Sequence, residues 1–159
     1  MSSVLVLVHA LVSIALVFAV THQAIALWPA PKSAGGGLLR QLRGVAGDHY
    51  TNAVIGLYLA NFVLGALLYS TYRLEVRPLL EDLYLLAPAG LFETKEHVAA
   101  LGLGLLPAYW VAWRYAGGRP SAQRIDPVPL ARRAVTLLLA FFVWFSLLAG
   151  HIVGNIKGV

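Results

Sequence analysis

The chain contains no cysteine, which excludes disulfide bonds, thiolate metal ligands and covalent c-type haem attachment. Charged residues are also scarce, because Asp, Glu, Lys and Arg make up only 12% of the 159 residues. That share is about half of what an ordinary soluble domain carries. Apolar residues reach 59%, and the mean hydropathy is +0.74. A soluble protein of this length could not bury so much apolar surface, so the composition predicts an integral membrane protein.

Long segments with few or no charges predict the membrane-spanning helices. A spanning helix needs about 20 mostly apolar residues. Four segments meet or approach this length, and the third does so only when its first four residues are included: 4–28, 49–72, 94–115 and 134–156. The sequence therefore predicts an all-α integral membrane protein, in which one four-transmembrane-helix bundle makes a single domain over residues 1–159.

The connection from Arg73 to Glu93 is the longest predicted on its side of the membrane. It has too many leucines for a solvated loop and too many acids for a span. Pro78 and Pro88 bracket its central part. We therefore expect a short interfacial helix in this outer loop, lying on the surface or covering the outer mouth of the bundle.

The basic residues are unevenly distributed, which predicts the orientation. Of the twelve Lys and Arg residues, eight lie in the loops after the first and third spans and four on the other side. By the positive-inside rule the Arg-rich loops face the cytoplasm. We expect a multi-pass protein of a prokaryotic cytoplasmic (inner) membrane with both termini extracytoplasmic. The net charge of +5 then reflects topology, and we expect no nucleic-acid partner.

Acids and bases stay out of the apolar stretches 4–28, 49–72, 98–113 and 134–156, whereas all five histidines lie inside them or at their edges: His9, His22, His49, His97 and His151. Ionisable residues within a membrane tend to mark function, and neutral imidazole ligates iron, copper or zinc. At a rise of 1.5 Å per residue, their positions separate into two levels. The outer level holds His9, His97 and His151, and the inner level holds His22 and His49.

Two levels of histidine are what two b-type haems stacked across a membrane would require, because facing helices can supply axial ligands to each iron. We expect His151 to ligate an outer haem, with His97 as its first partner and His9 in reserve. For a second, inner haem we expect ligation by His22 and His49.

The pattern resembles that of four-helix membrane b-type cytochromes, the haem-bearing anchor subunits of respiratory oxidoreductases. The resemblance covers the architecture and the histidine placement over the four spans. It implies one or two haem b groups, exchange of electrons with quinone, and other subunits of a membrane redox complex as partners. Arg73 and Arg77, at the outer interface, could pair with haem propionates or act as ordinary interfacial anchors.

Simpler interpretations remain open. His9 and His22 are separated by about 220° around an ideal helix, so one bundle interior would not easily receive both. Glu93 and His97, four residues apart on one helix face, could orient a ligand, accept a proton at a quinone site, bind a metal or form a solvated pair. Asn61 in the second span is most simply an interhelical hydrogen-bonding residue.

Other functions fit the sequence less well. No catalytic triad, phosphate loop or intramembrane acidic cluster is present, so we expect a non-catalytic subunit. The main alternative is a haem-free scaffold subunit of a larger membrane complex. A metal transporter using His9, His97 and His151 is a third possibility, and a single methionine with no cysteine argues against copper as its cargo.

Single cysteines placed at Ser33 and Ser121 test the orientation. Both positions lie in the Arg-rich loops that we expect to face the cytoplasm. We expect both to resist an impermeant thiol reagent in intact cells and to react after lysis. The chain has no cysteine of its own, so any labelling reports the introduced position. Ready labelling of either variant in intact cells would reverse the orientation.

Overall fold

The computed structural model describes residues 3–27, 49–114 and 128–156, and this part of the chain is helical and contains no strand. It confirms the all-α prediction. Three helical segments are long and apolar enough to cross a membrane: Ser3–Ala26, Tyr50–Asp82 and Leu130–Gly154. The loops that hold Ser33 and Ser121 lie outside the described residues.

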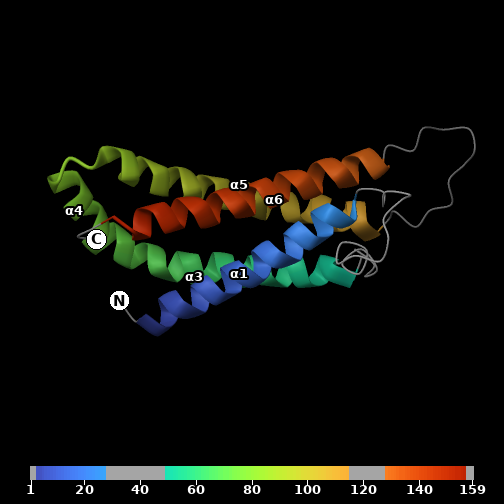
Figure 1. Cartoon of the computed structure of the whole chain (residues 1–159), viewed down its shortest axis with the longest axis horizontal. Coiled ribbons are helices and arrows are strands. Elements are labelled where there is room, and N and C mark those ends of the chain that lie inside the picture. Colours follow the sequence, from blue (N-terminus) through green and yellow to red (C-terminus); the bar gives the residue numbers. More distant parts are fainter. Residues whose placement is uncertain (1–2, 28–48, 115–127, 157–159) are drawn as a thin grey trace, which may run out of the picture.

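Four long helices form the bundle: α1 (Ser3–Ala26), α3 (Tyr50–Thr71), α5 (Leu86–Arg114) and α6 (Val128–Gly154). They pack in a ring, in which α1 contacts α3 and α6, and α5 contacts α3 and α6. Neighbours in the ring run antiparallel (Figure 1). The start of α1, the end of α6 and the short helix α4 (Arg77–Asp82) lie together at one end, here called the α4 end. The predicted number of long helices is therefore correct.

The outer connection differs in detail from the expectation. A π-helical segment, η2 (Tyr72–Val76), continues α3 directly into α4, whose first turn holds Pro78. The predicted short helix is thus present. The second half of the connection, from Leu86 onward, belongs to α5. Pro88 lies in the first turn of this helix, where its missing N–H costs no hydrogen bond.

The end of α4 is fixed by its backbone. Tyr84 adopts a left-handed conformation with φ of 55°. The Leu85 N–H donates to the Leu80 carbonyl at 2.8 Å, and the Tyr84 N–H donates to the Glu81 carbonyl at 3.0 Å. These two bonds form a Schellman motif, which usually places glycine where Tyr84 stands. The motif turns the chain into α5.

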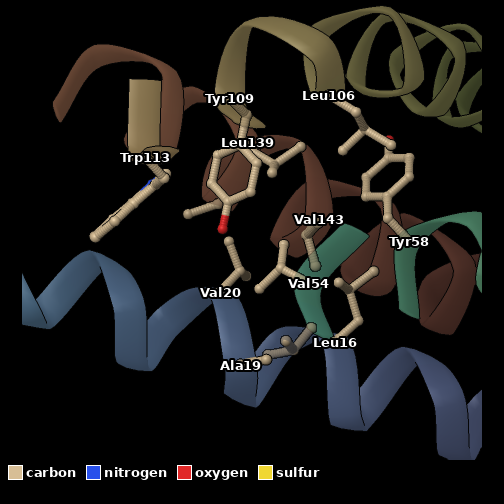
Figure 2. Packing of buried hydrophobic residues seen from close by; sticks show 12 residues of the cluster. Leu16, Ala19, Val20, Val54, Tyr58, Leu106, Tyr109, Trp113, Leu139 and Val143 are labelled. Atoms are coloured by element: carbon tan, nitrogen blue, oxygen red, sulfur yellow. The ribbon is translucent and has the colours of Figure 1, made fainter. Parts of the chain in front are cut away.

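Side chains from all four long helices make the apolar core (Figure 2). The residues that form its central layer are between 0% and 6% exposed: Leu16, Val20, Val54, Leu106, Leu139 and Val143. On the side away from the α4 end, the Tyr109 hydroxyl donates to Gln23 Oε1, and Gln23 Nε2 donates to Thr51 Oγ1 at 3.4 Å. Trp113 Nε1 donates to Thr136 Oγ1 at 3.0 Å. These bonds give partners to the buried side chains of Gln23, Thr51 and Thr136, which would otherwise destabilise the bundle.

The tightest approach between helices is made at Gly102 of α5. A Cβ atom at this position would lie 2.8 Å from Cζ of Tyr58 and closer still to its hydroxyl oxygen. The Tyr58 ring is buried, and its hydroxyl donates to the Ala99 carbonyl at 2.8 Å. Glycine is therefore required at 102 for Tyr58 to cross between α3 and α5.

Replacing Gly102 by alanine should displace Tyr58 and lower the free energy of unfolding by about 1–3 kcal/mol, as overpacking of a core does. Gly104 provides the matched control, since a Cβ there meets nothing within 4 Å. Gly104→Ala should be neutral or stabilise the helix by up to about 1 kcal/mol. Thermal unfolding of the purified protein in detergent measures both, and equal stability of the two variants would contradict the close contact.

Candidate functional site

A cavity of about 60 Å³ lies between the four long helices. It is on the α4 side of the central layer of the core, which we call the apolar layer. A volume of this size admits a few water molecules. Its polar lining comes from every helix: His9 and Ser13 of α1, Tyr58 and Asn61 of α3, Lys95 and Glu96 of α5, and Ser146 of α6. We call this the polar cavity.

Two opposite charges lie at the polar cavity. Lys95 Nζ is 2.6 Å from Glu96 Oε1, and the side chains are 14% and 26% exposed. The Lys95 stem runs along α6, since a Cβ at Gly150 would lie 3.8 Å from Lys95 Cδ. Lys95 and Glu96 belong to the predicted third span, 94–115, and both border the cavity. Each charge has an opposite partner there instead of facing an apolar environment alone.

His9 is half-buried at the same cavity. Its Nδ1 atom is buried and has no hydrogen-bond partner among the described residues. A Cβ at Gly65 of α3 would lie 3.5 Å from His9 Cε1, so the ring packs against a residue without a side chain. Because buried polar atoms in native structures nearly always have a partner, this nitrogen calls for a water molecule or a ligand in the cavity.

One turn along α1 from His9, Ser13 links two helices. Its hydroxyl oxygen lies 2.8 Å from the His9 carbonyl oxygen and 2.7 Å from Asn61 Oδ1. The Asn61 contact confirms the prediction of an interhelical hydrogen bond. A serine hydroxyl has one proton, so Ser13 can donate to only one of these acceptors at a time. The contact joins α1 to α3 beside the cavity.

The outer connection covers the α4 end of α5 through ionic and aromatic contacts. Arg77 pairs with Glu81 at 2.8 Å, from Nε to Oε1, and with Glu93 at 2.7 Å, from Nη1 to Oε1. The rings of Tyr72 and Phe92 stack with centroids 3.5 Å apart. These contacts fix α4 and η2 against α5 next to the polar cavity.

The remaining predicted ligands lie outside the polar cavity. His97 is exposed, with Nδ1 2.7 Å from the Glu93 carbonyl oxygen. His151 is exposed and contacts the amide nitrogen of Asn155 at 3.2 Å. The His22 ring contacts the Tyr50 ring at a tilt of 35°, with ring centroids 4.7 Å apart. His49 is exposed immediately before α3.

Helix geometry separates His97 from His151. Lys95 lies against α6 at Gly150, and His97 follows two residues later, which is about 200° around α5. His97 is therefore on the side of α5 turned away from α6, the helix that carries His151. Nor do the described residues include any group of three or more His, Asp or Glu side chains able to hold a metal ion.

The interior of the described bundle does not fit haem. The polar cavity receives one histidine, His9, and its volume of about 60 Å³ is too small for a porphyrin. At the other end of the bundle, the His22 ring contacts Tyr50 and His49 is exposed. Two arginines were expected to pair with haem propionates. Arg73 is exposed, and Arg77 forms ion pairs with Glu81 and Glu93.

Sequence reasoning missed Lys95 and Glu96 as residues of a site. They stand within the segment Phe92-Glu93-Thr94-Lys95-Glu96-His97 at the predicted edge of the third span, where charges usually face water. A usable signal was present. Gly102, Leu106 and Tyr109 are buried on α5. Counting back from Gly102 by seven residues, or about two helical turns, reaches Lys95 on the same side, and Glu96 is its neighbour.

Comparison with protein-family models, with curated proteins and with solved structures gives no match to this chain.

Proposed function

We propose that this chain is a membrane-embedded four-helix subunit that exchanges protons between the outer surface and the polar cavity. One observation carries the proposal: the Lys95–Glu96 pair and the unpartnered His9 nitrogen border one cavity inside a ring of apolar helices. Ionisable side chains that face the interior of a membrane bundle are a recurrent feature of proton relays and ion pathways.

The outward sides of the helices support membrane insertion. Large apolar side chains are strongly exposed on every long helix, including Phe18 at 71%, Leu67 at 57%, Leu101 at 63% and Phe141 at 60%. So much exposed apolar surface on one small protein indicates a lipid or protein environment around it. Combined with the basic loops, it favours an orientation in which the α4 end faces outward.

Two groups at the polar cavity are suited to take up and release a proton. Glu96 supplies a carboxylate, and His9 supplies an imidazole whose protonation changes near neutral pH in ordinary surroundings. Lys95 balances the charge of the ionised carboxylate, because an isolated buried charge would strongly destabilise the bundle. A few water molecules in a cavity of this volume would connect the two groups.

The apolar layer favours exchange with one side only. Leu16, Val54 and Leu139 are each 0–2% exposed and separate the polar cavity from the Gln23–Tyr109 hydrogen bond beyond them. A proton has no polar side chain to follow through this layer among the described residues. One-sided exchange suits a subunit that delivers protons to, or receives them from, a reaction in a larger complex better than it suits a channel.

Glu96→Gln and His9→Gln test the proposal by infrared difference spectroscopy of the purified protein during pH steps. The carboxylic-acid carbonyl signal that appears as the pH falls is the sum over the seven Asp and Glu residues of the chain, and Glu96→Gln should remove one component of it, the Glu96 band. We expect His9→Gln to move the midpoint of this band, because the two groups border one cavity. A pH-indicator dye should record about one proton less taken up per chain in each variant.

Glu75 provides the matched control, since it is an exposed acid of η2 outside the cavity. Glu75→Gln should leave the band and its midpoint unchanged. An unchanged carbonyl signal in Glu96→Gln would refute proton exchange at this cavity.

A b-type haem electron-transfer subunit is the second candidate, and His97 favours it. A carbonyl oxygen can only accept a hydrogen bond. His97 Nδ1 must therefore carry a proton and donate it in the 2.7 Å contact with the Glu93 carbonyl oxygen. The lone pair is then on Nε2, which is the arrangement common to metal-ligating histidines. Since His97 is exposed on the bundle, a haem held there would lie against a partner subunit. When bound, it would supply one-electron transfer.

Absorbance spectra of the protein purified with its native partners test this second candidate. A haem-bearing complex should show a Soret band and a sharp reduced α-band, and His97→Ala should remove one haem per chain. Thr94→Ala serves as a control, because Thr94 is exposed on the same helix and its hydroxyl donates to the Gly90 carbonyl. A colourless complex would exclude haem and leave a haem-free subunit.

A further inference from the structure

The Lys95–Glu96 pair needs an external support, because the two residues are adjacent on one helix. Neighbouring residues project about 100° apart, and positions i and i+1 do not face each other on a helix surface. A lysine side chain also has about 2 kcal/mol of rotamer entropy to lose. The helix alone would therefore not hold the ammonium 2.6 Å from the carboxylate.

Phe92 supplies one support for the lysine. It stands three residues before Lys95, a spacing at which side chains on a helix meet. The Lys95 ammonium lies over the Phe92 ring at 4.4 Å from the centroid, well within the range of a cation–π attraction. Glycine at 150 of α6 leaves room for the lysine stem, since a Cβ there would already approach Lys95 Cδ to 3.8 Å.

Tyr72 in turn holds Phe92. The two rings are nearly parallel, with an interplanar angle of 13° and a centroid distance of 3.5 Å. The Tyr72 hydroxyl is buried and has no hydrogen-bond partner among the described residues. The contribution of Tyr72 to this contact is therefore its ring. As the first residue of η2, Tyr72 connects the outer connection to α5.

We propose that Phe92, held by the Tyr72 ring, is a positioning residue that keeps the Lys95 ammonium against Glu96 at the polar cavity. This inference rests on the proposed proton exchange at Glu96. Phe92 itself does not border the cavity and acts only through Lys95.

The surroundings of Glu96 determine what loss of this support would do. Among the described residues that line the cavity, His9 faces it from α1 and Tyr58 from α3, while α6 offers only the hydroxyl of Ser146. Lys95 is the one permanent cation there. An ammonium that is no longer held beside Glu96 stabilises the ionised carboxylate less.

Infrared titration of the carboxylic-acid band, assigned with Glu96→Gln, tests the inference. Phe92→Leu should raise the midpoint of this band by about 1 pH unit, which is the size of shift that a nearby opposite charge produces. Phe92→Tyr keeps an aromatic face and should restore the midpoint of the unmodified protein. Tyr72→Phe keeps the stacked ring and removes only the unpartnered hydroxyl, so it should also match the unmodified protein.

Lys95→Met provides the reference for complete loss of the cation. In that background Phe92→Leu should produce no additional shift, because Phe92 acts through Lys95. A merely structural role of Phe92 would predict the same loss of thermal stability in both backgrounds and no shift of the midpoint. If Phe92→Leu fails to fold, the comparison moves to Tyr72→Leu, which should raise the midpoint, against Tyr72→Phe, which should not.

The outcomes separate the two proposals. No titrating Glu96 band in the unmodified protein would refute proton exchange itself. A normal Glu96 band whose midpoint is unchanged in Phe92→Leu and Tyr72→Leu would refute only the positioning role.

Discussion

A single ion pair between adjacent residues constrains the organisation of the bundle at its α4 end. Lys95 and Glu96 lie between apolar helices with less than a third of either side chain exposed. Removing one partner of such a pair leaves an uncompensated charge, which costs far more than the pair itself contributes. Three features keep both charges together inside the bundle: the Phe92 ring against the Lys95 ammonium, the space that Gly150 leaves for the lysine stem, and the cavity that both side chains border.

Hydropathy was sufficient to predict the long helices, but local backbone chemistry decided their ends. Spans free of charge, such as residues 49–72, appear as helices with bounds close to those expected. The start of α5 was misplaced because Pro88 suggested a break, whereas a proline in a first turn is compatible with a helix. The end of α4 was not predictable either, since the residue in the left-handed conformation is Tyr84 and not a glycine.

The site was only partly predictable, for a reason that lies in side-chain direction. His9 was singled out because an ionisable ring within an apolar segment is unusual, and the structure places it at the polar cavity. The direction of Lys95 and Glu96 depends on how α5 is rotated in the bundle, which tertiary packing at Gly102 and Tyr109 determines. The same rotation leaves His97 exposed, which its sequence neighbours do not reveal.

The apolar layer between Leu16 and Leu139 also has an electrical consequence. In an insulating bilayer the membrane potential acts mainly across the region of lowest dielectric constant, and moving one charge through it involves about 2.3 kcal/mol per 100 mV. Glu96 lies on the α4 side of this layer. A proton that reaches Glu96 from that side crosses little of the field, so its binding would depend on the acidity of the adjacent compartment and hardly at all on the voltage.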